Sequence, residues 1–322
     1  MEMFKRYFFI LFLVNTLNGR TQDVHFSQYY NIPQMINPAL IGDGQMRSRL
    51  ILNFRNQSSF TPNPYKTLSF SGETKLKNES FSCGIIFLHD KSGVSDYSTN
   101  EFCASGVNSI QLTKQHSIKF AFQGGWTQYA VDENNLSWNS QFDGSKINTS
   151  IPSGEPIRKG FGYFDLSTGM VWKYQMTNKN EIKTGISAFH ITHPLYNVFT
   201  AKKLDIRWCI YNEACILIKN TNIRILPSVL FMKQGSANEV DIGTSAKCKI
   251  GVNKRYTPDK IASYAYFGCY YRSNDAIMLL TGISFQEQMI VSISYDITSS
   301  QLSKVQKDSG SIEFSVAYII QN

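Results

Sequence analysis

The chain has 322 residues and a formal net charge of +8, from 32 Lys and Arg against 24 Asp and Glu. Aromatic residues make up 13% of it and charged residues only 17%, a composition rich in strand formers and poor in the residues that fill soluble helices. The cations are scattered singly, so the basic stripe that binds phosphate backbones is missing and we expect no nucleic-acid partner. One large all-β domain is compatible with this length.

The first residues have the order of a secretory signal peptide. Lys5 and Arg6 precede an apolar stretch at 7–14, and small or polar residues follow at 15–21. The apolar stretch is too short to cross a bilayer of about 30 Å. A buried N-terminal helix is the alternative interpretation. We expect residues 1–21 to be a cleaved signal peptide, which would make this an exported protein.

The segment that follows, residues 22–45, is rich in aromatic residues and prolines. In Asn37-Pro38 and before Pro33 the chain is held extended or turning, because the residue before a proline avoids the helical region. Phe26, Tyr29 and Tyr30 are then free to pack into a lumen or a periplasmic mouth. Our hypothesis is that residues 22–45 form a plug or a partner-docking segment. The alternative is a disordered exported N-terminus.

Beyond residue 45 the apolar segments are short and alternate with polar or small residues. Near the C-terminus, Phe314, Val316 and Tyr318 fall on one face of a strand, and Glu313 and Ser315 on the other. Such alternation occurs in soluble sheets, and it occurs with the opposite sense in transmembrane barrels. Turn signals divide the chain into fourteen candidate strands, at residues 46–55, 65–75, 80–91, 97–111, 115–129, 162–176, 180–191, 203–212, 223–233, 238–250, 262–273, 276–286, 288–297 and 310–320.

Several of these strands have the length of about 9 to 11 residues that a membrane-spanning strand needs. Tyr and Trp gather near their ends, as in the aromatic girdle of a barrel at the lipid interface, although packing within a soluble sheet is an alternative. The girdle candidates are Trp126, Tyr129, Trp172, Tyr174, Tyr256, Tyr270, Tyr271 and Tyr295. The sequence predicts an all-β fold, a transmembrane antiparallel β-barrel of about 14 strands over residues 46–322. The Gly/Pro/Asn/Ser-rich stretch 131–160 would be a surface loop or a plug.

Nothing in the sequence points to catalysis. His190 and His193 lie three residues apart on a predicted strand, so their side chains would point to opposite faces and could not share a ligand. The six cysteines form no CxxC pair, and the choice between disulfides and free thiols stays open. Nucleophile-elbow, metalloprotease, P-loop and dinucleotide motifs are missing. We expect no enzyme, no metal site and no cofactor.

Particular segments carry a resemblance to a known family. The stretch QDVHFSQYYNIP at 22–33, followed by INPALIG at 36–42, closely resembles the opening of the PorP/SprF family of type IX secretion system membrane proteins. Matches continue in the same order along the mature chain, with NFRNQ at 53–57, GISAFH at 185–190, YRSNDA at 271–276, SYDIT at 294–298 and GSIEFS at 310–315. The chain departs from the family in its many cysteines and in ending at Gln321-Asn322 rather than on an aromatic residue.

The resemblance implies an outer-membrane component of the type IX secretion and gliding machinery. Its implied partners are other type IX components, the outer-membrane lipid and a secreted surface adhesin with a type IX C-terminal domain, which it would help to export or anchor. The residues that we expect to contact a partner are Phe26, Tyr29, Tyr30, Asn37 and Pro38. The rival interpretation is an outer-membrane porin or hydrophobic-solute transporter, and a soluble periplasmic β-protein is a third.

Overall fold

The structure is a computed structural model. It describes residues 23–44, 46–57, 64–77, 80–92, 97–131, 136–148, 150–152, 154, 160–177, 179–196, 202–250, 263–299 and 310–321. The expected signal peptide, residues 1–21, lies outside these residues, and so does Tyr256 of the expected girdle.

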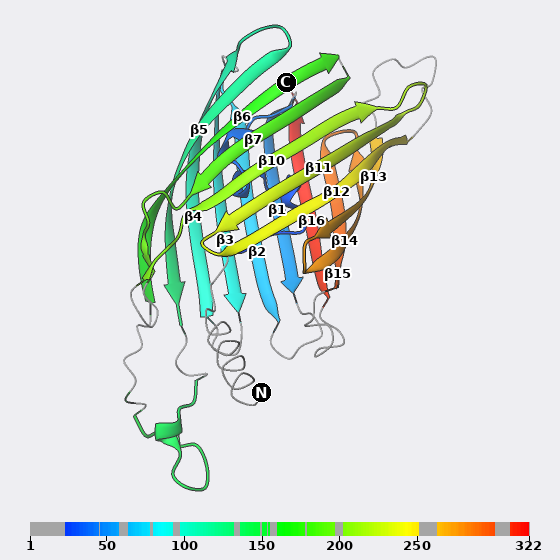
Figure 1. The fold of residues 1–322 in the computed structure, drawn as a ribbon. Helices are drawn as coiled ribbons and strands as arrows, with labels where there is room; N and C mark the ends of the chain where they lie inside the picture. The colour runs from blue at the N-terminus through cyan, green and yellow to red at the C-terminus, as the bar shows by residue number, and fades with distance from the viewer. Residues whose placement is uncertain are drawn as a thin grey trace, which may run out of the picture.

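Within these residues, fourteen antiparallel strands close into one barrel, in which each strand pairs with its neighbours and β1 pairs with β16 (Figure 1). The barrel strands are β1 (Met46–Gln57), β2 (Tyr65–Lys75), β3 (Phe81–Ser92), β4 (Tyr97–Gln111), β5 (His116–Ala130), β6 (Gly160–Thr177), β7 (Asn180–Phe189), β10 (Arg207–Leu217), β11 (Ile223–Gln234), β12 (Ala237–Ile250), β13 (Ser263–Arg272), β14 (Ala276–Phe285), β15 (Met289–Thr298) and β16 (Ser311–Gln321). A short hairpin of β8 (Leu195–Tyr196) and β9 (Lys202–Lys203) stands apart from them.

The predicted barrel is confirmed, and most predicted strands agree with the observed ones to within two residues. The largest difference is the strand predicted at 203–212, which the structure places at Arg207–Leu217. Lys203 instead pairs with Leu195 in the β8–β9 hairpin. That pairing uses part of the chain that the alternation pattern assigned to the barrel.

The alternation along the strands has the sense expected in a membrane. On β16, Phe314 and Val316 are exposed on the outer surface, whereas Glu313 and Ser315 are 1% and 2% exposed and face the lumen. Apolar side chains therefore face lipid and polar ones line the interior. Among the helices of the described residues, none has the length and apolar character to cross a membrane.

A barrel of this size has a lumen that wall side chains alone do not fill, since that limit is reached at about eight strands. Here the lumen holds residues 23–43, which we call the luminal segment (dark blue in Figure 1). The structure describes all of its residues, and they form short 3-10 turns η1 (Tyr29–Asn31), η2 (Pro33–Met35) and η3 (Pro38–Leu40). Prolines begin η2 and η3, where a missing N–H costs nothing.

The luminal segment runs along the barrel from one end to the other. Asp23 lies beside Gln234, where β11 ends, and Asp43 lies beside Lys119 and Lys183 near the opposite ends of their strands. We call these the vestibule end and the Asp43 end. The chain then enters β1 at the Asp43 end, where the C-terminus also lies (Figure 1).

Two further expectations are resolved by the fold. The sequence predicts Tyr129 and Tyr270 in the girdle, but both point into the lumen, where Tyr270 stacks on Tyr30 with ring centroids 5.8 Å apart. Trp126 and Tyr295 are exposed on the outer surface, as a girdle requires. All six cysteines are among the described residues, and all six are free thiols.

Candidate functional site

The barrel wall holds the luminal segment through charged side chains. The Glu313 carboxylate accepts hydrogen bonds from the backbone N–H groups of Ser27 at 2.8 Å and Gln28 at 3.2 Å. Asp296 accepts one from the Ser27 hydroxyl at 2.5 Å, and the Arg55 guanidinium donates to the carbonyl of His25 at 2.6 Å. Carboxylates and guanidinium groups make stronger hydrogen bonds than neutral groups. These contacts therefore fix the backbone path of the segment.

Asn37 joins the segment to the opposite wall. Its Nδ2 donates to the carbonyls of Met170 and Ile186, both at 3.0 Å, and its Oδ1 caps η3 by accepting from the N–H of Ala39. This approach needs glycines in the wall, because a Cβ at Gly169 would lie 2.1 Å from Asn37 Oδ1 and one at Gly185 would lie 2.8 Å from its Nδ2. The close approach of Asn37 thus explains why position 185, in the GISAFH motif, is a glycine.

A lysine cluster holds the Asp43 end of the segment. The Asp43 carboxylate lies 2.6 Å from Lys183 Nζ, 3.6 Å from Lys119 Nζ and 3.7 Å from Lys173 Nζ. Burial opposes ionisation, but these lysines together lower the pKa of Asp43 well below its usual value. Lys119 also donates to the carbonyl of Gly42 at 3.2 Å. The segment is therefore tied at this end as it passes into β1.

The aromatic residues expected to contact a partner contact the barrel itself. Tyr29 is 4% exposed, and its hydroxyl lies 2.7 Å from the Ser228 hydroxyl. Its ring meets those of Tyr30 and Tyr270 edge to face. Phe26 and Pro38 are also buried. In this arrangement these side chains secure the luminal segment inside the lumen.

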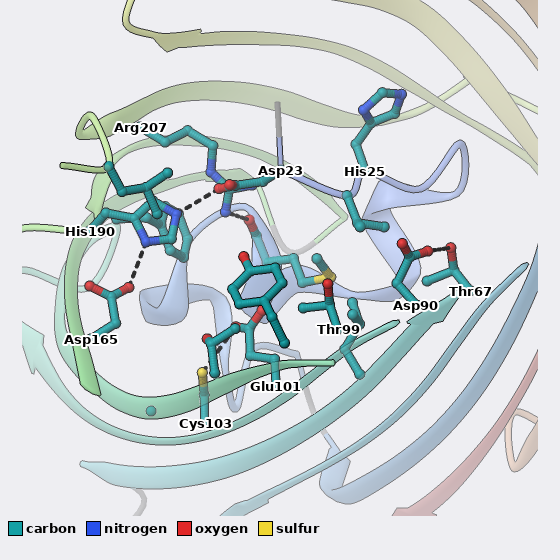
Figure 2. Close-up of a pocket in the computed structure, with 18 of the residues that line it drawn as sticks. Asp23, His25, Thr67, Asp90, Thr99, Glu101, Cys103, Asp165, His190 and Arg207 are labelled. Atoms are coloured by element: carbon teal, nitrogen blue, oxygen red, sulfur yellow. Dashed lines mark hydrogen bonds and ion pairs between the residues drawn. The ribbon is translucent and has the colours of Figure 1, made fainter. Parts of the chain in front are cut away.

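Above the segment, at the vestibule end, the lumen opens into a cavity of about 390 Å³, which we call the vestibule (Figure 2). Val24, His25 and Met35 of the luminal segment line it, together with the lumen-facing ends of β2 to β6 and the connection between β7 and β10. Its 25 lining residues include four carboxylates and five tyrosines, together with two histidines, one arginine, hydroxyl side chains and apolar side chains. Figure 2 shows Glu101 and Asp90 on neighbouring strands, facing the group formed by Asp23, His190 and Arg207.

An ion-pair chain closes one side of the vestibule. His190 Nε2 lies 2.7 Å from Asp23 Oδ2, and His190 Nδ1 lies 2.7 Å from Asp165 Oδ2. Arg207 NH1 lies 3.3 Å from the same Asp23 oxygen. Burial would lower the pKa of His190, but Asp23 and Asp165 outweigh it and raise that pKa to about 10. The imidazole is therefore a cation at neutral pH.

The sequence does not predict these ion pairs, because its alternation pattern puts both histidines on a strand. The strand β7 ends at Phe189, and His190 and His193 lie in the following connection with φ of 60° and 46°. His190 then turns toward the lumen, while His193 is exposed. The GISAFH motif contained His190, but no local signal pairs it with Asp23, which lies 167 positions away in the sequence.

The charge state of His190 predicts a pH-dependent stability. The pKa of His190 in the folded protein is raised from 6.5 to about 10. The stabilisation of the folded state by protonated His190 is therefore complete below pH 6.5 and is lost as the pH rises through 10. We expect His190→Gln to lower the free energy of unfolding by about 2–3 kcal/mol near pH 6. The difference from the unmodified protein should disappear near pH 11. Denaturant unfolding in lipid vesicles at both pH values measures it.

The matched control is His193→Gln, which alters the exposed histidine of the same connection and should leave stability unchanged at both pH values. A His190→Gln effect of equal size at pH 6 and pH 11 would contradict the ionic origin of the stabilisation.

No group of three or more His, Cys, Asp or Glu side chains suited to a metal occurs among the described residues. Fold and lumen together define an outer-membrane β-barrel whose interior is occupied by its own N-terminal segment. The sequence profile described as "Type IX secretion system membrane protein PorP/SprF" matches residues 18–318. The chain therefore belongs to the PorP/SprF family. No curated protein sequence matches it.

Solved structures share the architecture. The "CymD monoaromatic hydrocarbon channel" is similar with a TM-score of 0.52 and 12% identity, covering 91% of this chain and 93% of that one. A FadL homologue from Pseudomonas aeruginosa gives a TM-score of 0.51 and 9% identity, covering 88% of this chain and 92% of that one. At such identities the likeness shows the fold alone. The family and these neighbours are secretion components and transport channels.

Proposed function

We propose that this protein, without catalysing a reaction, supports the export or surface anchoring of a large adhesin-like protein by the type IX secretion machinery. Membership of the PorP/SprF family supports work alongside other secretion components. A client with a type IX C-terminal domain and the surrounding outer-membrane lipid complete the proposed set of partners.

The orientation of the barrel follows from its connections. In outer-membrane barrels the longer loops are extracellular and the short turns are periplasmic. The longest connections here, residues 131–159 and 190–206, leave the barrel at the vestibule end. The vestibule would then open to the cell exterior, where an exported client arrives.

The observation that carries the proposal is a free strand edge beside the vestibule. β6 pairs with β5 from Gly160 to Tyr174, but with β7 only from Thr168 to Thr177. Within the described residues, 160–167 of β6 therefore have a strand partner on one side only. In the part of the chain that the structure describes, the backbone hydrogen bond to this edge comes from Ile191 N to the carbonyl of Leu166 at 3.0 Å. We propose that the rest of the edge accepts a further strand. Exposed edges recruit peptides by strand addition.

The edge provides a sharp test in cells. Backbone groups alternate in direction along a strand, so the N–H of Phe164, two residues before Leu166, also points away from β5. Phe164→Pro removes that donor without touching the β5 ladder. We expect it to lower the amount of surface adhesin about tenfold, which corresponds to ~1.4 kcal/mol of docking energy.

The matched control is Phe164→Ala, which removes the exposed ring and keeps the N–H, and which should display the adhesin normally. Quantitative surface proteomics compares both variants with a gene deletion, in which one large surface protein should be lost. Normal display in the proline variant, with a heat-modifiable and hence folded barrel, would contradict docking at this edge.

The segment residues Phe26, Tyr29, Tyr30, Asn37 and Pro38 remain proposed for partner docking. Their burial supports an indirect form of that role, in which they hold the vestibule floor in place for a client.

A second candidate function is passage of a small apolar solute, favoured by a cavity of about 390 Å³ in a barrel with the fold of a hydrocarbon channel. Solute uptake by proteoliposomes that contain the purified protein would favour this alternative, whereas loss of one adhesin on gene deletion favours secretion.

A further inference from the structure

The charged groups of the vestibule divide into two sets. Asp23 and Asp165 are compensated, because His190 contacts both carboxylates and Arg207 contacts Asp23. Glu101 and Asp90 have no ion-pair partner among the described residues. Within the described ranges, the Glu101 carboxylate receives a hydrogen bond from the Cys103 thiol at 3.1 Å, and Asp90 receives one from the Thr67 hydroxyl at 2.6 Å. The cavity therefore holds two carboxyl groups that no cation in the described part of the chain contacts.

These two carboxylates come from neighbouring strands and from the lumen face of both. Asp90 on β3 is directly opposite Thr99 on β4, and Glu101 is the next residue of β4 on the same face. Diagonal neighbours of this kind are roughly 7–8 Å apart. Figure 2 shows the Asp90 carboxylate turned toward Thr67 on β2, and the Glu101 carboxylate turned toward Cys103 on β4. A ligand therefore needs more than one N–H donor to contact both carboxylates.

An independent observation marks the same wall. Gln123 on β5 lines the vestibule and is 5% exposed, yet its Oε1 accepts no hydrogen bond within the described part of the chain. Buried side-chain acceptors are satisfied in the large majority of cases, because an unpaired one costs free energy. Gln123 is on the strand next to Glu101 and Cys103. A donor entering the vestibule would satisfy it.

Aromatic rings form the outer part of the wall. Tyr129 lies 5.6 Å from Tyr97, 6.0 Å from Tyr163 and 5.1 Å from Tyr196, measured between ring centroids. The Tyr97 and Tyr196 hydroxyls lie 2.7 Å apart, which ties the β8–β9 hairpin to the barrel over the cavity. Tyrosine faces attract cations through the ring quadrupole.

We propose that the vestibule is a binding site for an organic cation, an alkylammonium or guanidinium group of the kind that Lys and Arg side chains carry. Glu101 and Asp90 provide the opposite charge, Gln123 Oε1 accepts a further N–H, and the tyrosines enclose the alkyl stem. The volume of about 390 Å³ is within the range of small-molecule pockets and accommodates a residue with its neighbours in a peptide.

The chemistry of the cavity distinguishes this ligand from others. An anion would meet the uncompensated carboxylates, which repel it. A neutral sugar would stack on the tyrosines and leave that charge unpaired. A cation with several N–H donors can pair with the carboxylates, donate to Gln123 Oε1 and contact the faces of the tyrosine rings at the same time.

The purified full-length protein in detergent micelles provides the test, by isothermal titration with a matched set of compounds. The cations are N-acetyl-lysine methylamide and N-acetyl-arginine methylamide. The neutral counterparts are the norleucine and citrulline derivatives, the anion is the glutamate derivative, and methyl glucoside represents sugars. We expect both cations to bind at least about tenfold more tightly than their neutral counterparts.

Variants locate the binding to the proposed wall. Glu101→Gln and Asp90→Asn keep the shape of the side chain, and together they should weaken cation binding by about 10- to 100-fold. Asp143→Asn makes the same change of charge on an exposed connection and should bind as the unmodified protein does. The heat-modifiable band verifies that each barrel is folded.

The source of the cation is distinguished with a Lys-containing tripeptide and free cadaverine. Tighter binding of the tripeptide indicates a polypeptide, and equal or tighter binding of cadaverine indicates a small cation. The proposal of a cation site would be contradicted by tighter binding of a neutral or anionic compound, or by unchanged cation binding in the double variant. It would also be contradicted if no cation showed saturable binding at ligand concentrations up to roughly 10 mM. The site does not depend on the proposed export role, which is measured separately in cells.

Discussion

Replacing Arg272 with alanine should lower the free energy of unfolding of the barrel by about 3–5 kcal/mol. Arg272 is 1% exposed on the lumen face, and its guanidinium lies 3.4 Å from both Glu239 and Asp241, 3.2 Å from Asp275 and 3.7 Å from Asp296. Removing it leaves buried carboxylates facing one another without their cation. Urea unfolding in lipid vesicles, followed by tryptophan fluorescence, measures the loss.

Two further variants test the cause of this loss. Arg272→Lys should recover only part of it, since a point charge on a flexible stem does not contact several carboxylates in the fixed geometry of a guanidinium. Arg47→Ala, which removes an exposed arginine at the start of β1, should change stability by less than about 0.5 kcal/mol. A loss under about 1 kcal/mol for Arg272→Ala would show that the carboxylates are not held by this residue.

Deleting residues 23–43 should convert the barrel into an open pore. The luminal segment fills a lumen too wide for its wall side chains, so the unmodified protein should give little or no conductance in planar bilayers. The deletion should give stable ionic conductance of the kind that an unplugged wide barrel shows. Heat-modifiability of the band on gels verifies that the deleted form still folds.

A milder variant keeps this prediction testable if the deletion does not fold. Asn37→Ala removes the hydrogen bonds to Met170 and Ile186 and the cap on η3, at a cost of about 2–3 kcal/mol. We expect it to give transient openings. High, steady conductance of the unmodified protein would contradict a lumen closed by this segment and would favour the porin alternative.

The proposed docking edge and the vestibule lie next to each other, because both result from the early end of β7. β7 ends at Phe189 and its pairing with β6 stops at Thr168, so it does not cover the β6 edge at 160–167, and the following connection carries His190 into the lumen. The chain leaves the sheet after Phe189, and this both exposes the β6 edge and places one wall of the vestibule. A client strand on the edge would pass directly beside the cavity.

The barrel could be predicted from local sequence patterns. Strand position and strand number follow from period-two alternation and turn residues, which are local properties of ten or so consecutive residues. The side that faces lipid follows only when strand length, aromatic placement and the family resemblance are added, because alternation alone is shared with soluble sheets. The exceptions are also local, since the strand predicted at 203–212 begins later because Lys203 pairs with Leu195. The sequence also singled out residues 22–45 as unlike the rest, through their aromatic residues and prolines.

The organisation of the interior could not be predicted in this way, because it depends on contacts between residues far apart in the sequence. Glu313 meets the N–H of Ser27 across 286 positions of sequence, and His190 meets Asp23 across 167. Such contacts depend on the register of every strand pair around the closed barrel, because a slip by one residue turns a side chain from lumen to lipid. For the same reason the sequence could not show that Glu101, Asp90 and Gln123 share one cavity. Their strands had to be brought together first.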